Sequence, residues 1–116
     1  MQLSAILLAA LASSSLAITP IAIGYQYRVS TINYNIAYVE GKDPCKEDVA
    51  ISLLGKERCN RPFRLAGATY ELKNCGKSNW QILRNGKFAG DCKAIKDKKV
   101  HCGGSTHDVI KTAICA

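Results

Sequence analysis

The sequence has few of the residues that usually carry metal binding or catalysis. Its 116 residues include only two histidines and one tryptophan. No Cys-x-x-Cys pair occurs, and His101 and His107 do not complete a familiar zinc-ligand spacing. The Gly-x-Ser-x-Gly, His-Glu-x-x-His and phosphate-loop patterns are also absent. We therefore expect no metal site, no cofactor and no enzymatic activity.

The sequence also lacks an apolar run long enough to cross a bilayer. Its most apolar stretch, MQLSAILLAALASSSLA, occupies residues 1–17. The purely apolar part of this stretch is far shorter than the roughly 20 residues that a membrane-spanning helix needs. The stretch ends in Ser15-Leu16-Ala17, which suits cleavage by signal peptidase after Ala17. We interpret residues 1–17 as a signal peptide, and expect residues 18–116 to form one secreted, extracellular, monomeric domain.

Cysteines are plentiful by contrast, and all six fall within residues 18–116. An even number of cysteines in a short exported chain predicts three disulfides, because the compartment is oxidising and a small core gives only marginal stability. Each disulfide should add about 2–4 kcal/mol, mainly by restricting the unfolded chain. Spacing does not choose among the possible pairings. The cysteines are Cys45, Cys59, Cys75, Cys92, Cys102 and Cys115.

Basic residues outnumber acidic ones in the predicted mature domain. Sixteen Lys and Arg against nine Asp and Glu give a formal net charge of +7, and none of these residues lies within residues 1–17. This balance favours contact with anionic partners such as phospholipid, wall polymer, nucleic acid or an acidic protein face. Solubility alone also explains it, so the charge does not identify a partner.

An Asn85-Gly86 pair between two apolar runs predicts a tight hairpin turn. Both residues accept the positive φ angles of a type I′ turn. The resulting register sets Arg84 opposite Lys87, and this like-charge pair costs stability unless solvent or an anionic partner screens it. The tip is therefore a candidate binding site. The next expected pairs are Leu83 with Phe88 and Ile82 with Ala89.

A second basic cluster lies in CKAIKDKKVHC, between Cys92 and Cys102. If both cysteines are bonded, the segment is anchored at both ends, and its lysines lose less entropy when they meet a partner. The alternative is a solvated turn. The candidate binding residues of the two clusters are Arg84, Lys87, Lys96, Lys98 and Lys99, and Lys93 belongs to the same run.

The expected fold class is α+β, a small disulfide-stapled domain with an antiparallel sheet and one short helix. Residues 25–39 alternate like a strand, but the apolar phase changes at Ser30-Thr31, where we expect a bulge or short bend. After Asp43, a capping residue, Pro44 and the acidic residues that follow favour a helix that Gly55 closes. The alternative for this segment is a strand on which Val49, Ile51 and Leu53 align. Beyond Pro62 the segments FRL, ATYELKN, NWQIL, KFAGDCK, KKVHC and DVIKTAIC are strand-like.

A signal peptide, a small basic domain, six spaced cysteines and the run RPFRLAGATYELKNCGKSNWQILRNGKFAGDC together resemble the small secreted cysteine-rich effectors of plant-associated filamentous fungi. The resemblance implies a virulence or host-manipulation protein located in the apoplast or at the interface with host cells. It also implies action by binding rather than by catalysis. The expected partner is a host protein or an anionic cell-surface component, and we expect no binding to DNA.

Two alternatives remain open. Antimicrobial and killer-toxin-like proteins are similarly small, basic and disulfide-stapled, and they act on anionic membranes or walls through cationic loops. A small secreted ribonuclease is less favoured. Its active site would need a general base, a general acid and a cation that binds phosphate. Side chains of these kinds are present at Glu71, Arg84, His101 and His107.

Overall fold

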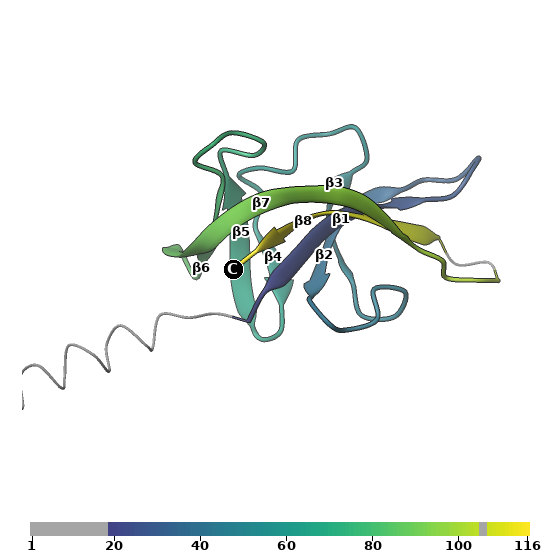
Figure 1. Cartoon of the computed structure of the whole chain (residues 1–116), viewed down its shortest axis with the longest axis horizontal. Helices are drawn as coiled ribbons and strands as arrows, with labels where there is room; N and C mark the ends of the chain where they lie inside the picture. The colour runs from purple at the N-terminus through teal and green to yellow at the C-terminus, as the bar shows by residue number, and fades with distance from the viewer. Residues whose placement is uncertain (1–18, 105–106) are drawn as a thin grey trace, which may run out of the picture.

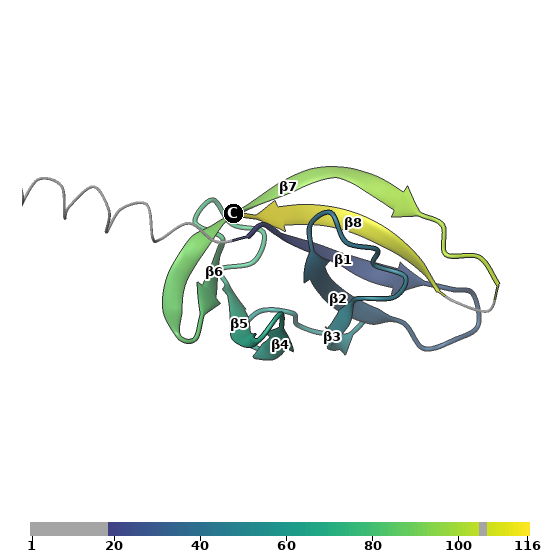
Figure 2. The same cartoon turned by 90° about the horizontal axis from the view of Figure 1, so that it is seen from below.

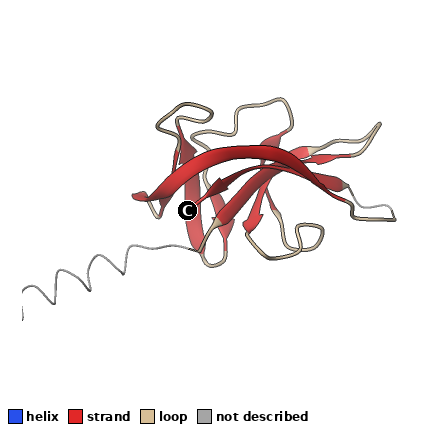
Figure 3. Cartoon of the chain, viewed as in Figure 1, coloured by secondary structure: helices blue, strands red, loops and turns tan. Residues whose placement is uncertain are grey.

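The computed structural model describes residues 19–104 and 107–116, so the predicted signal peptide lies outside the described residues. These residues form an all-β domain whose antiparallel sheet curls into a nearly closed barrel (Figures 1 and 2). Strands and loops account for the whole of the described chain (Figure 3). The strands are β1 (Ile21–Tyr27), β2 (Tyr34–Val39), β3 (Val49–Leu53), β4 (Phe63–Leu65), β5 (Ala68–Lys73), β6 (Gln81–Arg84), β7 (Lys87–Val100) and β8 (Asp108–Cys115).

The sheet order is β3-β2-β1-β8-β7-β6-β5-β4. All neighbouring strands are antiparallel, and the first and last strands of the described residues, β1 and β8, pair in the middle of the sheet. The two edge strands, β3 and β4, approach each other without pairing through backbone hydrogen bonds. The barrel is therefore closed except for the seam between β3 and β4.

The barrel interior is filled by alternate residues of the strands. On β5 the fully buried positions are Ala68, Tyr70 and Leu72, and the residues between them are only partly buried. This two-residue period is what a strand with one interior face requires. The rings of Phe63 and Tyr70 stack with centroids 5.9 Å apart. The interior side chains of the other strands and connections include Ile21, Ile23, Ile51, Trp80, Ile82, Cys92 and Cys115.

A second, smaller core lies on the opposite face of β1, β2 and β8. It contains Ala22, Ile36, Tyr38 and Val109, with Val100 packed against it. The connection between β2 and β3 is tied to this face, because Lys111 of β8 makes an ion pair with Glu40 of the connection. Burial, and then the nearby Glu40 carboxylate, raise the pKa of Tyr38 to about 12.

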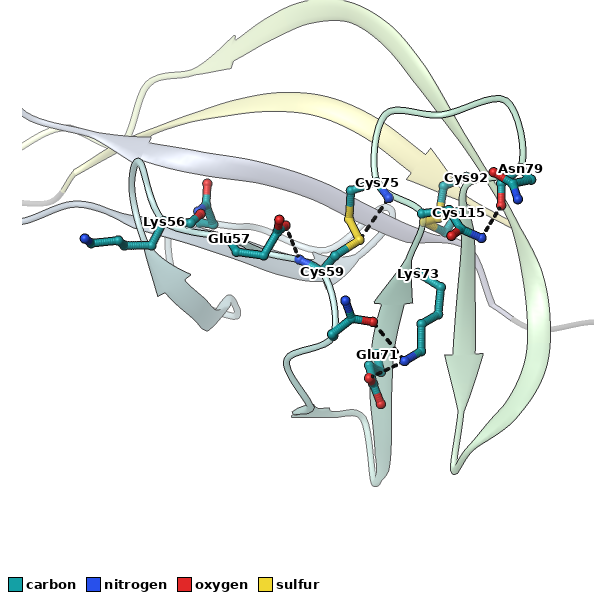
Figure 4. The surroundings of a disulfide bond; sticks show 12 residues. Lys56, Glu57, Cys59, Glu71, Lys73, Cys75, Asn79, Cys92 and Cys115 are labelled. Atoms are coloured by element: carbon teal, nitrogen blue, oxygen red, sulfur yellow. Dashed lines mark hydrogen bonds and ion pairs between the residues drawn. A yellow bond between two sulfur atoms is a disulfide. The ribbon is translucent and has the colours of Figure 1, made fainter.

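Three disulfides staple the domain, as the even cysteine count predicts, and the described residues contain no free cysteine. Cys45–Cys102 joins the β2–β3 connection to the segment after β7, across 57 residues of sequence. Cys59–Cys75 joins the connections before β4 and after β5 (Figure 4). Cys92 and Cys115 face each other in the β7–β8 register, which brings their Cα atoms to 3.9 Å.

The helix expected after Asp43 is wrong, and the fold class is all-β rather than α+β. Asp43 begins only a single turn, in which its backbone oxygen accepts hydrogen bonds from the N–H groups of Lys46 and Glu47. From Val49 onward the chain forms β3, as the alternative for this segment held. Pairing with β2 and burial of Ile51 in the barrel decide the conformation, because a helix this short has little stability of its own.

The Asn85-Gly86 turn is confirmed, with φ angles of 51° and 83°. Arg84 pairs with Lys87, and Leu83 pairs with Phe88, as expected. The next expected pair is wrong, because Ile82 faces Gly90 instead of Ala89. A β-bulge absorbs the extra residue, which bends β7 so that it continues the curl of the barrel.

The structure confirms one further expectation about the strands and corrects another. The bend expected at Ser30-Thr31 is present as the turn between β1 and β2, where Ser30 has a φ of 64°. The phase of the apolar pattern changes there because residues 25–39 belong to two strands. The segments KFAGDCK and KKVHC are not separate, since residues 87–100 form the single 14-residue strand β7.

Candidate binding surfaces

The predicted lysine cluster lies on a strand rather than on a loop or turn. Strand β7 arches along the length of the barrel (Figure 1), and the four lysines of the cluster, Lys93, Lys96, Lys98 and Lys99, are all exposed. Both flanking cysteines are bonded, Cys92 to Cys115 and Cys102 to Cys45. The cluster is therefore held at both ends. Pairing with β8 also holds Lys93, Lys98 and Lys99, whereas Lys96 lies in the irregularity between Ala94 and Lys98, where the register with β8 shifts.

Most of these lysines have no acidic partner. Lys99 lies 3.4 Å from Asp108. Lys93, Lys96 and Lys98 make no ion pair within residues 19–104 and 107–116. Lys98 stands opposite Lys111 on β8, and Lys111 is already paired with Glu40. Like charges placed opposite each other on neighbouring strands are unfavourable, and a bound anion would relieve that cost.

Arg84 and Lys87 form a separate basic site at the β6–β7 tip. Both are exposed, and neither makes an ion pair with any residue that the structure describes. This tip lies at one end of β7, whereas Lys98 and Lys99 lie near the other end (Figure 1). The two predicted basic clusters therefore do not converge on one site.

The residues considered for ribonuclease chemistry are not brought together. Glu71 on β5 makes an ion pair with Lys73 at 2.9 Å (Figure 4). Arg84 lies at the β6–β7 tip. His101 and His107 both belong to the connection between β7 and β8, at the far end of β7. His101 pairs with Asp108 at 3.1 Å, and His107 Nδ1 lies 2.7 Å from Asn33 Oδ1.

An Asp108-centred network holds the β7–β8 tip. Asp108 Oδ1 accepts a hydrogen bond from the Cys102 N–H at 2.9 Å, and its carboxylate also meets Lys99 and His101. These contacts, chiefly the one from Cys102, lower the pKa of Asp108. The contact between His107 and Asn33 joins this tip to the β1–β2 turn.

Sequence reasoning missed an exposed apolar surface at this same end of the molecule. Among the described residues, seven large hydrophobic side chains are exposed, and six of them belong to the β1–β2 hairpin or to the end of β3. The β1–β2 and β7–β8 tips project side by side there (Figures 1 and 2). We name this surface the apolar end. Its residues are Tyr27, Val29, Ile32, Tyr34, Leu53 and Leu54.

One group of potential metal ligands occurs in the described residues, formed by Glu57, Cys59 and Cys75. The two sulfur atoms are joined in a disulfide and are not thiolates. Glu57 Oε1 accepts a hydrogen bond from the Cys59 N–H at 2.8 Å (Figure 4). The Glu57 carboxylate therefore stabilises the backbone of this loop. The group does not offer the thiolate ligands that zinc prefers.

The single tryptophan lies in the interior next to a cation. Trp80 is buried, and the Arg58 guanidinium lies 4.8 Å from the centre of its ring. Burial lowers the pKa of Arg58. The indole Nε1 of Trp80 has no hydrogen-bond partner in the described structure. We assign this contact to packing of the buried ring.

Comparisons with protein-family models, curated proteins and solved structures give no match. Within residues 19–104 and 107–116, no helix has the length and apolarity required to cross a membrane.

Proposed function

We propose that this protein is a secreted cysteine-rich effector of a plant-associated filamentous fungus, which acts by binding an anionic component of the host cell surface. The observation that carries the proposal is the set of three exposed lysines between Cys92 and Cys102 that make no ion pair with any described residue, Lys93, Lys96 and Lys98. Three disulfides in a domain of this size agree with an oxidising extracellular compartment.

The backbone of β7 favours binding through these lysines. A charged segment on a mobile loop loses backbone freedom when it binds, and this loss weakens binding. Here the disulfides at Cys92 and Cys102 anchor the segment at both ends, and pairing with β8 restricts the backbone at Lys93 and Lys98. At these two positions only the lysine side chains need to be ordered on contact with an anion, and Lys96 lies in the short irregularity between them.

The lysine surface can be tested by salt-dependent binding to an immobilised polyanion. The triple variant Lys93→Gln, Lys96→Gln, Lys98→Gln should elute at clearly lower salt, because exposed charges act over roughly 8 Å at physiological ionic strength. A matched variant, Lys56→Gln, Arg61→Gln, Lys77→Gln, removes the same charge from exposed positions elsewhere. Equal elution of the two triple variants would show that only net charge matters, and would contradict a site on β7.

A second candidate function is favoured by the apolar end. A cationic protein with exposed apolar side chains at one end has the chemistry of an antimicrobial protein that acts on anionic membranes. Growth inhibition of competing microbes, measured beside infiltration into plant leaves, separates the two. A response in leaves without growth inhibition supports the effector, and the reverse result supports the antimicrobial protein.

A further inference from the structure

We infer that the apolar end inserts into the surface of an anionic phospholipid bilayer. The inference deepens the proposed function, on which it rests, by naming the anionic component as membrane lipid and the inserting element as the β1–β2 hairpin. Four observations carry it: the exposure of the side chains at the apex, their projecting position, the tyrosines behind them, and the lysine behind the tyrosines.

The apex of the hairpin is aliphatic. Val29 and Ile32 are 70% and 66% exposed, and neither belongs to either core of the domain. Both flank the turn that connects β1 and β2, so their exposure does not result from a gap in the barrel. Small proteins rarely gather exposed apolar side chains at one place unless that surface meets an apolar environment.

The shape of the surface favours lipid over a protein partner. The hairpin tip projects from the end of the barrel (Figures 1 and 2), and beside it Tyr27 and Val29 line an open pocket together with Lys99 of β7. A protein partner would have to supply a matching pocket, whereas the boundary of a bilayer adapts to a protruding apolar tip. Interfacial segments of proteins lie about 5–10 Å deep in this boundary.

Tyr27 and Tyr34 lie directly behind the apex, one on each strand of the hairpin. They are 51% and 36% exposed. Tyrosine rings are enriched where acyl chains meet head groups, because the ring is apolar and the hydroxyl is polar. Leu53 of β3 pairs with Tyr34 in the sheet and extends the apolar surface at the same level.

The register of the sheet places cations behind the tyrosines. Tyr25 of β1 and Lys99 of β7 both pair with Ile110 of β8, so Lys99 lies two residues farther from the apex than Tyr27. Lys98 lies at the next level, where Lys111 of β8 pairs with Gly24 of β1. At about 3.3 Å per residue, Lys99 stands roughly 7 Å behind Tyr27, the last residue of β1.

This order matches the layers of a lipid surface. The aliphatic side chains Val29 and Ile32 come first, and the tyrosine rings lie behind them. The exposed Arg28 lies at the level of the rings, and Lys99 and Lys98 lie behind it, as the phosphates lie outside the acyl chains in an anionic bilayer. Since Lys99 is paired with Asp108, the unpaired Lys98 is the cation that we expect to contribute more to attraction by anionic lipid.

Sedimentation with lipid vesicles tests the inference on the disulfide-intact protein. We expect binding to vesicles of phosphatidylcholine mixed with phosphatidylserine or phosphatidylglycerol, and much weaker binding to phosphatidylcholine alone. The double variant Val29→Thr, Ile32→Thr should lower the partition coefficient at least about tenfold, since two apolar side chains no longer enter the bilayer.

The matched control is Phe88→Thr. Phe88 is also highly exposed, at 61%, but it lies at the opposite tip, between β6 and β7. It should leave vesicle binding unchanged. Equal loss in both variants, or no loss in the Val29/Ile32 variant, would overturn the inference. Fluorescence of the buried Trp80 shows whether each variant keeps its core.

Placement of the tip is measured with a second variant, Ile32→Trp. Its new indole should be quenched by lipids that carry bromine on their acyl chains, whereas Trp80, buried in the barrel, should not. Absence of quenching in the vesicle-bound protein would contradict insertion. Retained polyanion binding without vesicle binding would refute the membrane inference and leave the proposed function standing. Loss of both would refute both.

Discussion

Replacement of Gly24 by alanine should destabilise the barrel, because two backbones approach too closely there for any side chain. A Cβ atom on Gly24 would lie 2.2 Å from the backbone oxygen of Ile110 and 3.1 Å from the Cα of Lys111. Ordinary Cβ contacts begin at 3.4 Å, so β1 and β8 would have to separate by more than an ångström. Neither obstacle is a flexible side chain that can rotate away.

The size of the effect follows from what that separation breaks. The two neighbouring hydrogen bonds of the β1–β8 ladder would each lose about 1 kcal/mol. Strain in the tightly packed strands adds about 1–3 kcal/mol. Alanine has less backbone entropy than glycine in the unfolded chain, which offsets about 0.5–1 kcal/mol of this loss of stability. We expect a net loss of about 2–4.5 kcal/mol, which lowers the Tm by roughly 8–36 °C for a domain of this size.

Thermal and urea unfolding of the disulfide-intact protein, followed by circular dichroism, measures this loss. Gly76→Ala is a suitable control, because Gly76 has a φ of 76° and a Cβ added there would meet no atom within 4 Å. Its cost should come only from the left-handed backbone, about 1 kcal/mol. If Gly24→Ala were as stable as the parent protein, or less harmful than Gly76→Ala, the close approach of β1 and β8 would be refuted.

Three further predictions concern Tyr38 in the second, smaller core, the basic pair Arg84 and Lys87, and the Asn85-Gly86 turn between them. The pKa of Tyr38 in the folded protein is about 12, above the ordinary 10.0. The free energy of unfolding should therefore keep its full value below pH 10 and decrease between pH 10 and 12. Urea unfolding should show this decrease in the parent protein and a smaller one in Tyr38→Phe. The double change Arg84→Ser, Lys87→Thr should leave the Tm equal or slightly higher, because it removes a like-charge pair; a clear drop in Tm would contradict this. Gly86→Val should lower the Tm, because a β-branched residue resists the φ of 83° at that position; an unchanged Tm would show that the turn is not needed in this form.

Several features of the fold could be predicted because they depend on short stretches of sequence. The Asn85-Gly86 turn depends on two residues that accept positive φ angles, and the structure has both of them there. The alternation in β5 follows from its single interior face. The oxidised state of all six cysteines followed from their even number in a short chain with a signal-like N-terminal segment.

The candidate site could be predicted only in part. Residues 92–102 contain basic residues at a density that composition alone reveals, and the structure exposes its lysines. The segments KFAGDCK and KKVHC were predicted as strands, but their union in one strand was not, because it depends on the pairing that β8 offers from across the chain. The apolar end was missed because the alternation of residues 25–39 predicts strands without showing which of their apolar residues extend beyond the barrel.

The sequence by itself determined the local choices of this protein: where the chain turns tightly, which residues can alternate in a strand, and that its cysteines are bonded. The tertiary structure alone decided the conformation after Asp43, the disulfide partners and the bulge opposite Ile82. These depend on contacts between segments far apart in the chain, such as Cys45 with Cys102. The physical reason is that a short helix and a short strand differ little in free energy on their own, so burial against distant strands selects between them.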